Sequence, residues 1–97
     1  MIVNRRTFVV KRGCMQDLVA MVKAEQERLN VAITFRVYTP NIAPLNLVVA
    51  EWEFESLQEY EKFLADWRAS PETAEFMKKW YELTESGGVN EIWNLET

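Results

Sequence analysis

The apolar and polar positions of the chain point to one strand that is apolar on both sides. In residues Leu45–Phe54, apolar side chains occur at odd positions such as Leu47 and Val49, and also at even positions such as Val48 and Trp52. Successive side chains of a strand point to opposite faces, so both faces of this segment are apolar. A strand of this kind is normally covered on both sides. We therefore expect a central strand that needs a cover on each face.

The residues before this segment predict a strand, a helix and a second strand. Residues Ile2–Lys11 are rich in β-branched side chains, which favour a strand. From Met15 to about Leu29 apolar residues recur at helical spacing, and Asn30 is a residue type that ends helices. Residues Val31–Thr39 alternate again and predict the second strand. The two prolines of residues Pro40–Pro44 predict a loop.

The residues after the central segment predict a broken helix and a last strand. Ser56 begins a helix, with a glutamate three residues later as in a capping box. A second start signal follows at Ser70–Glu72, where proline stands at the first helical position. The range from Ser56 to about Glu85 is therefore expected to be two helical pieces. We expect Ser86–Gly88 to terminate the helix and Val89–Leu95 to form a short final strand.

The resulting element order is β-α-β-β-α-β, the α+β ferredoxin-like arrangement. In this fold the first and third strands are central, and the helices lie on one face of the sheet. The other face would then be an exposed apolar patch, larger than a monomer usually tolerates. We expect a homodimer in which two sheets pack face to face and form a barrel-like core.

Composition and charge limit the kinds of partner. The chain has 97 residues, 48% of them hydrophobic, and a net charge of −4, which indicates one globular domain over residues 1–97. The basic residues are dispersed, so no nucleic acid is expected. No apolar run is long enough for a membrane span, and residues 1–11 lack the continuous apolar region of a secretory signal. The single cysteine excludes an intrachain disulfide, and we expect a reducing, cytoplasmic location.

The sequence contains no histidine. This excludes Ser-His and Cys-His catalysis, imidazole metal sites and a histidine-ligated haem, and we expect neither a metal ion nor a cofactor. Glu51, Glu53 and Glu55 alternate along the third strand, a pattern in which carboxylates can act as acid and base or hold Mg²⁺. We favour a salt-bridged strand end, because buried carboxylates are rare unless they are paired.

Arg36 and Tyr38 lie on the polar side of the second strand. Polarity predicts that this side meets Glu51, whereas the apolar side of the strand joins Trp52 beneath the helices. An Arg–Glu pair at the centre of the dimer is either structural or part of a pocket for a small anion, which arginine binds through its two-pronged donor geometry. Arg6 is a weaker candidate of the same kind, because the two faces of its strand are not distinguishable.

Two other features have both a functional and a structural interpretation. Cys14 precedes the first helix, where a thiol can become reactive, but no base partner is identifiable and an incidental cysteine is favoured. A group of large side chains in the C-terminal half is suited to form an aromatic cage, although helical spacing favours core and interface packing. The group comprises Trp67, Phe76, Met77, Trp80, Tyr81 and Trp93.

The opening NRRTFVVKRGCMQDL resembles the start of the NIPSNAP-like family in the dimeric α/β-barrel superfamily. The shared features there are an Arg-Thr-aromatic element at Arg6–Phe8 and a Lys-x-Gly turn at Lys11–Gly13. The stretch YTPNIAPLNLVVAEWEFESLQEYEKF is also similar to the family, with a tryptophan at the strand end, Trp52, and a Ser-Leu-x-x-Tyr helix entry at Ser56–Tyr60. The resemblance covers nearly the whole chain.

Two positions depart from the family pattern. Asn4 stands where the family usually has an acid, and Ala43 stands where it has a loop glycine. The superfamily includes cofactor-free oxygenases, haem-degrading enzymes, dismutases and members of unknown role. The resemblance therefore implies the dimer more directly than it implies a reaction, and the lack of histidine disfavours haem degradation.

These observations lead to two functional hypotheses. The first is a small-molecule site in the cleft between the sheet and the helices, used for a cofactor-independent oxygenase or isomerase reaction. Its expected ligand-binding residues are Arg6, Arg36, Tyr38, Glu51 and Trp52. The alternative is a non-enzymatic ligand-binding or assembly module in which the same residues only hold the dimer.

Overall fold

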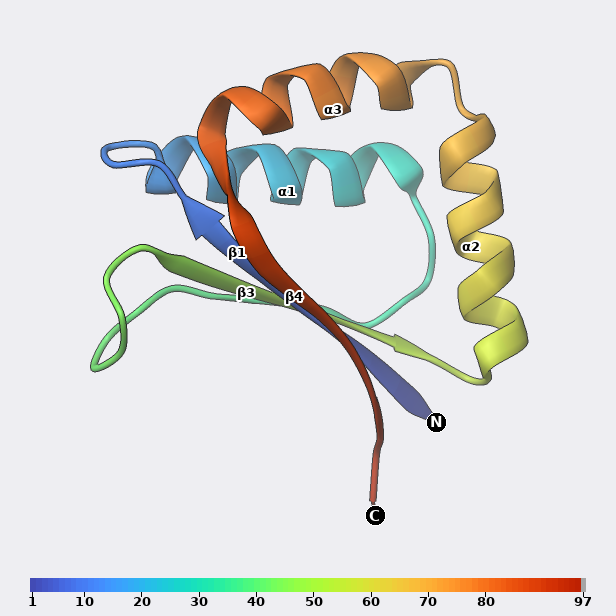
Figure 1. Cartoon of the computed structure of the whole chain (residues 1–97). Helices are drawn as coiled ribbons and strands as arrows, with labels where there is room; N and C mark the ends of the chain where they lie inside the picture. Colours follow the sequence, from blue (N-terminus) through green and yellow to red (C-terminus); the bar gives the residue numbers. More distant parts are fainter. Residues whose placement is uncertain (97) are drawn as a thin grey trace.

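A computed structural model describes residues 1–96 of the chain as four strands and three helices (Figure 1). The elements are β1 (Ile2–Val10), α1 (Met15–Leu29), β2 (Phe35–Tyr38), β3 (Leu47–Phe54), α2 (Leu57–Ala69), α3 (Glu72–Leu83) and β4 (Thr84–Asn94). The predicted α+β ferredoxin-like class is confirmed. The predicted break in the second helical segment is confirmed as well, because Ser70 ends α2 and α3 begins two residues later.

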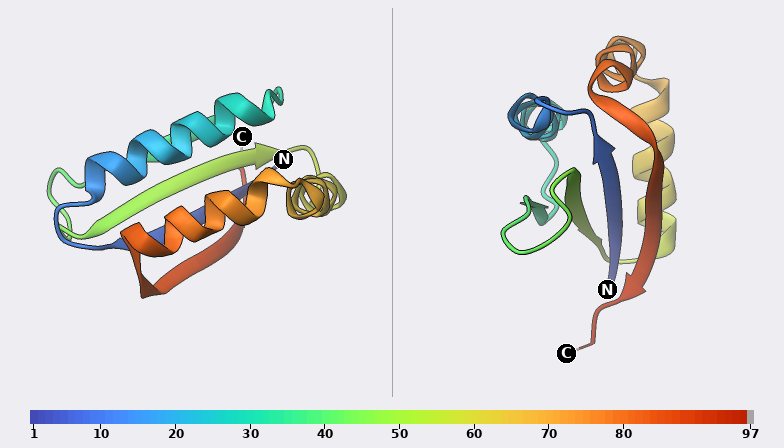
Figure 2. Two further views of the ribbon diagram at one scale, coloured as in Figure 1. Left: turned by 90° about the horizontal axis from the view of Figure 1, so that it is seen from above. Right: turned by 60° about the vertical axis from the view of Figure 1, so that its left-hand side comes forward.

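The four strands form one antiparallel sheet in the order β2-β3-β1-β4. The first and third strands are central, as predicted. All three helices lie on one side of the sheet: α1 and α3 run side by side above it, and α2 crosses one end (Figure 1, Figure 2). We call the side toward the helices the covered face and the opposite side the open face.

The second and third strands begin later than predicted. Strand β2 starts at Phe35 instead of Val31, because residues 31–34 are needed to cross from the end of α1 down to the sheet (Figure 1). Only the carbonyl oxygen of Thr34 still accepts a strand-like hydrogen bond, from the Glu53 amide at 3.0 Å. Strand β3 starts at Leu47, and Leu45 before it is 85% exposed.

The expected end of the last helix at Ser86–Gly88 is wrong. Helix α3 ends at Leu83, and β4 continues from Thr84 through both glycines. The pairing of β1 with β4 shifts register between Thr7 and Val9, which indicates a bulge. At Gly88 a Cβ would lie 2.7 Å from the carbonyl oxygen of Thr7, and Gly87 has a φ of +105°. The glycines therefore serve a bulged strand that passes close to its neighbour.

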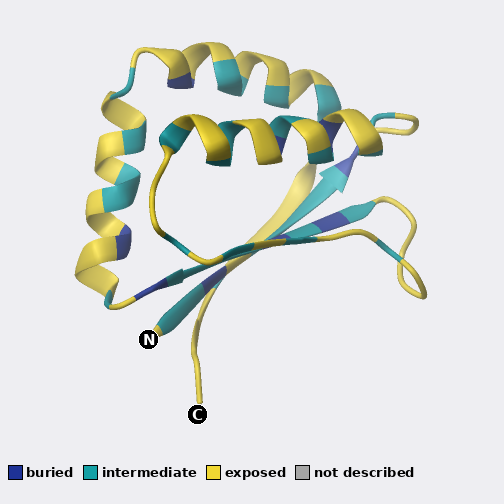
Figure 3. Cartoon of the chain, turned by 180° about the vertical axis from the view of Figure 1, so that it is seen from behind, coloured by how far each residue is buried: buried dark blue, intermediate teal, exposed yellow. Residues whose placement is uncertain are grey.

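The central strand β3 is apolar on both faces, but the chain covers only one of them. Val48 and Ala50 are fully buried beneath the helices, where Leu18 of α1 is also fully buried. Leu47 and Val49, on the open face, are only half-buried. Figure 3 shows a second contrast, between the central strands β1 and β3, which carry buried positions, and the edge strand β4, which is mostly exposed.

Candidate functional site

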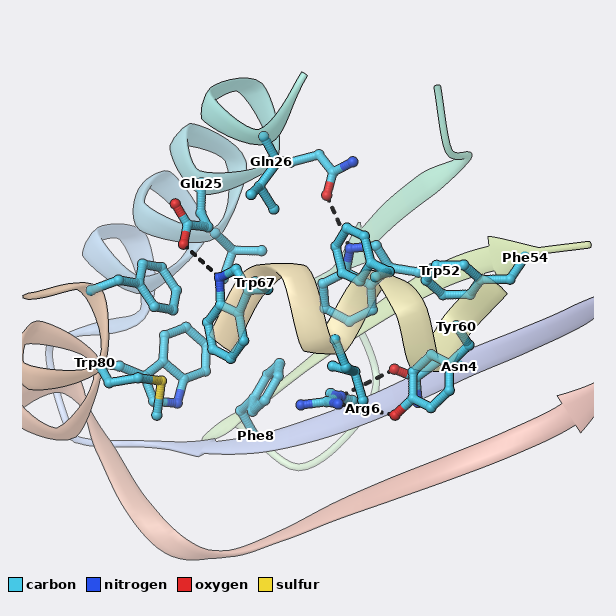
Figure 4. A pocket seen from close by; sticks show the side chains of 16 residues that line it. Asn4, Arg6, Phe8, Glu25, Gln26, Trp52, Phe54, Tyr60, Trp67 and Trp80 are labelled. Atoms are coloured by element: carbon cyan, nitrogen blue, oxygen red, sulfur yellow. Dashed lines mark hydrogen bonds between the residues drawn. The ribbon is translucent and has the colours of Figure 1, made fainter. Parts of the chain in front are cut away.

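A cavity of about 170 Å³ lies between the covered face of the sheet and the three helices (Figure 4). Sixteen residues line it, and half of them are aromatic. The aromatic residues are Phe8, Trp52, Phe54, Tyr60, Phe63, Trp67, Phe76 and Trp80. Cavities of this size that are lined by apolar side chains suit small organic ligands.

Contacts between aromatic rings build two parts of the cavity wall. In one part, Trp80 packs edge-on against Phe8 with ring centroids 4.6 Å apart and stacks on Phe76 at 5.6 Å. In the other, Phe54 contacts Tyr60 at 5.3 Å and Phe63 at 5.4 Å. Such pairs favour fixed ring orientations, so the wall is preorganised by the fold.

Two tryptophans of the cavity are tied to helix α1 through their indole N–H groups (Figure 4). Trp52 Nε1 donates to Gln26 Oε1 at 3.0 Å, and Trp67 Nε1 donates to Glu25 Oε2 at 2.9 Å. Burial alone would raise the pKa of Glu25, but hydrogen bonds from Arg28 and Trp67 together lower it below the ordinary value. The ionised carboxylate therefore joins α1 to α2 beside the cavity.

Arg6 is the cationic group of the cavity wall. Its Nε donates to Asn4 Oδ1 at 3.1 Å, and its Nη2 donates to the Tyr60 hydroxyl at 3.2 Å (Figure 4). Asn4 is 2% exposed, and its Nδ2 donates to Asn90 Oδ1 at 2.6 Å and to the Glu91 carbonyl oxygen at 2.9 Å. Within residues 1–96, Arg6 has no carboxylate at ion-pair distance.

The five predicted ligand-binding residues do not form one site. Arg6 and Trp52 line the cavity, whereas Arg36 and Glu51 line a shallow hollow on the open face, where Tyr38 also lies. The reason is the register, which pairs Arg36 with Glu51 and places both on the side away from the helices. The expected cleft that contains all five residues is therefore corrected to two groups on opposite faces.

The polar group of the open face is internally paired, as polarity predicted. The Tyr38 hydroxyl donates to Glu51 Oε1 at 2.9 Å, which raises the pKa of Tyr38. Arg36 Nη1 lies 2.5 Å from Glu53 Oε2, and Arg5 Nη1 lies 3.5 Å from Glu51 Oε2. The favoured salt-bridged interpretation thus holds for Glu51 and Glu53, whereas Glu55 follows the end of β3, is exposed and has no ion-pair partner within residues 1–96. No group of three or more acidic, cysteine or histidine residues within residues 1–96 is placed to hold a metal ion.

The remaining candidates from the sequence, the aromatic group and Cys14, also divide between the cavity and positions outside it. Trp67, Phe76, Met77 and Trp80 line the cavity, but Tyr81 and Trp93 are 66% and 57% exposed outside it. Cys14 packs against the core cluster around Leu18, and the only hydrogen-bond contact of its thiol within residues 1–96 is weak, to the Arg12 carbonyl oxygen at 3.9 Å.

Sequence reasoning missed four polar members of the cavity. Glu25 and Gln26 on α1 were not among the predicted site residues, and neither was Tyr60, which was identified only as part of the entry to the following helix. Asn4 gave no local signal of this role, because the mixed polarity of β1 does not show which of its two faces turns toward the helices. Its partner Asn90 lies at the far end of the chain, so no local pattern shows the bond.

None of the helices within residues 1–96 combines the length and the apolar character that crossing a membrane requires.

Comparison with known proteins places the chain in a family context. The family model described as NIPSNAP matches residues 3–90. The structure is similar to protein Atu4242 from Agrobacterium tumefaciens, with 26% identity and a TM-score of 0.82 over 97% of this chain and 92% of that chain. It is also similar to an uncharacterized NIPSNAP-like domain protein from Burkholderia xenovorans, with 23% identity and a TM-score of 0.85 over 99% and 85% of the two chains.

A more distant similarity extends to a structure described as an antibiotic biosynthesis monooxygenase. Identity is 8% and the TM-score 0.71, with both chains covered completely. At this identity the likeness concerns the fold alone. No curated protein matches the chain.

Proposed function

We propose that this chain, which belongs to the NIPSNAP family, binds a small, mainly apolar organic molecule between its sheet and its helices. The observation that carries the proposal is the aromatic cavity of about 170 Å³. An engineered apolar cavity of about 150 Å³ is large enough for benzene. The volume therefore suits one aromatic or aliphatic ring with small substituents.

Tryptophan fluorescence tests this proposal directly, because three of the four tryptophans line the cavity. In the variant Trp93→Phe the emission comes only from these three. We expect 4-bromotoluene, whose bromine quenches nearby indoles, to reduce this emission in a saturable way. A cavity-filling change, Val22→Phe, should abolish the saturable part, while the matched change Val89→Phe on exposed β4 should not. Quenching that is linear with concentration in all variants would refute binding in the cavity.

The same cavity supports a reaction without metal or haem, as a cofactor-independent oxygenase or isomerase would need. Tyr60 is 6% exposed and accepts a hydrogen bond from Arg6, and its hydroxyl donates to no residue among 1–96, so its proton is available to a bound molecule. A hydroxyl beside a guanidinium suits proton donation to an oxygen that becomes negative during the reaction. The fold shared with a protein described as a monooxygenase supports the same proposal.

Turnover distinguishes an enzyme from a binding module. With small cyclic carbonyl compounds and oxygen supplied, an enzyme should lose most of its kcat in Tyr60→Phe, since the hydroxyl that donates the proton is removed, and its affinity for the compound should fall much less, although Arg6 also loses a hydrogen-bond acceptor. The matched control is Tyr38→Phe, on the open face. Binding without turnover across the panel would instead favour the non-enzymatic module.

The open face is our proposed contact with a second copy of the chain. Its exposed apolar side chains include Tyr38, Val89 and Trp93, which are 45%, 50% and 57% exposed. Its arginines Arg5 and Arg36 already have carboxylate partners. A copy can therefore approach without meeting an unpaired arginine, and a C2 homodimer would cover this patch on both molecules at once.

A further inference from the structure

We propose that the natural ligand of the cavity is an organic anion, a carboxylate on a single ring, whose charged group binds Arg6 and whose ring lies among the aromatic side chains. This inference rests on the proposed binding function and names the ligand class. It is carried by three observations: the donors that Arg6 has left over, the lack of a carboxylate beside it, and the fixed position of its guanidinium.

The donor count leaves one edge of the guanidinium open. Arginine has five N–H groups: one on Nε and two on each Nη. The bonds to Asn4 and Tyr60 use the Nε hydrogen and one hydrogen of Nη2. One hydrogen on Nη2 and both on Nη1 have no acceptor within residues 1–96, and Nη1 is not sealed from solvent. The Nη1–Nη2 pair is the fork that matches the two oxygens of a carboxylate.

No carboxylate among residues 1–96 compensates the charge of Arg6, unlike that of its neighbours in the sheet. Arg5 on the same strand pairs with Glu51, and Arg36 pairs with Glu53. Glu25, which also lines the cavity, is already paired with Arg28 at 2.5 Å. A charge among apolar groups is unfavourable unless a counter-charge accompanies it. An anionic ligand would supply this counter-charge, whereas a cationic ligand would be repelled.

Two buried groups hold the guanidinium where a ligand can reach it. The Asn4 amide has a defined orientation, because its Nδ2 must donate to the Glu91 carbonyl and its Oδ1 is thus left to accept from Arg6. Tyr60 fixes the other side from α2. On the neighbouring strand β3 the residue opposite Arg6 is Ala50, whose single methyl group takes up little of the space beside the arginine side chain. Arg6 is therefore preorganised, and ligand binding need not order a flexible side chain.

The apolar side chains around Arg6 determine the chemical character of the uncharged part of the ligand. In Figure 4 the guanidinium lies between Phe8 on one side and the Asn4–Tyr60 pair on the other. Beyond Phe8 the wall continues as Trp80, which packs against it at 4.6 Å. A flat ring joined directly to the carboxylate would contact these aromatic faces. The cavity volume limits the ligand to about one ring of the benzene class.

The test compares two probes of nearly the same shape, 4-bromobenzoate and 4-bromotoluene, by tryptophan quenching in the full-length Trp93→Phe protein. We expect 4-bromobenzoate to bind at least about tenfold more tightly. Adding Arg6→Met should weaken 4-bromobenzoate by about tenfold to a hundredfold, or ~1.4–2.8 kcal/mol, and leave 4-bromotoluene within about twofold. The matched control Arg5→Met, one residue away on the open face, should change neither affinity.

The outcomes separate this inference from the proposed function. If 4-bromotoluene binds and 4-bromobenzoate binds no better, or if the preference survives Arg6→Met, the anion inference is overturned while the cavity still binds ligands. If neither probe quenches saturably, both proposals fail. Should Arg6→Met not fold, Arg6→Lys decides: it keeps the charge without the fork, and 4-bromobenzoate should bind several-fold more weakly. If the affinity for 4-bromobenzoate is unchanged in that variant, the proposed binding of its carboxylate by the Nη1–Nη2 pair of Arg6 is refuted.

Discussion

The two faces of the sheet each carry arginine side chains, but they provide these arginines with different partners. Arg5 and Arg6 are adjacent on β1, and strand alternation sends them to different faces. On the open face, Arg5 meets Glu51 at 3.5 Å and is 46% exposed. On the covered face, Arg6 meets an amide and a phenol and finds no carboxylate within residues 1–96. The arginines of the open face already have carboxylate partners, which suits contact with a second protein copy. The arginine of the covered face has none among residues 1–96, which suits an anionic ligand.

The largest expected effect concerns the open face. Trp93→Glu should disrupt the proposed homodimer, because the change places a charge in each of two symmetric contacts. An interface tryptophan of the kind that dominates binding contributes about 2 kcal/mol or more, so the expected loss is ~4 kcal/mol per dimer, or roughly a thousandfold in Kd. Light scattering at micromolar concentration should give twice the 11.4 kDa of one chain for the unchanged protein and 11.4 kDa for the variant.

Tyr81→Glu is the matched control for that experiment. Tyr81 is 66% exposed, but it lies on α3, away from the open face. The dimer mass should persist in this variant. A mass of one subunit for the unchanged, folded protein would contradict the proposed dimer itself.

A pair of valines should show an intermediate effect that reports on both faces. Val48→Ala removes two buried methyl groups from the covered face, where Val48 is 0% exposed, and should cost about 2 kcal/mol of unfolding free energy at any protein concentration. Val49→Ala changes the half-buried neighbour on the open face. Its cost in urea unfolding should be below ~1 kcal/mol for the dilute monomer and should rise with concentration as the dimer forms. Equal costs at all concentrations would argue against burial of the open face.

The smallest expected effect concerns Glu25, the carboxylate that lines the cavity. The pKa of Glu25 is below the ordinary value of 4.5, so its ionised form stabilises the fold. This contribution is complete above that value and is lost as the pH falls through the lowered pKa. Glu25→Gln should therefore cost about 1 kcal/mol at pH 7 and much less at strongly acidic pH. Urea unfolding at the two pH values, with the exposed Glu27→Gln as control, measures the difference. A cost that does not depend on pH would contradict the role of the charge.

Much of the covered face was predictable because it follows from local patterns. The apolar side of β2 joins Trp52 beneath the helices as expected, with the Phe35 and Trp52 rings 5.2 Å apart. The helix break at Ser70 was encoded in a serine–proline–acid signal. The start of β4 was not predictable in this way. Gly87 and Gly88 are typical of a helix end, and the close approach of Gly88 to Thr7, which is distant in the sequence, becomes visible only in the folded chain.

The site was less predictable than the fold. Arg6, Arg36, Tyr38, Glu51 and Trp52 are all polar or amphipathic residues of strands, so they seemed to belong together. Their division depends on the face to which β1 turns Arg6, and the mixed polarity of that strand gives no local indication of it. The partner Tyr60 lies 54 positions away along the chain.

The order of the elements, the central position of β3 and the apolar surface on both its sides follow from the amino-acid sequence alone, since each depends on residues close together in the chain. The three-dimensional fold was needed to show which arginine is paired with a carboxylate and which has none among residues 1–96. Strand register sets this, by placing Glu51 across from Arg5 and Ala50 across from Arg6. Electrostatic pairing acts over a few ångströms in space, and the distance between two residues along the sequence does not encode it.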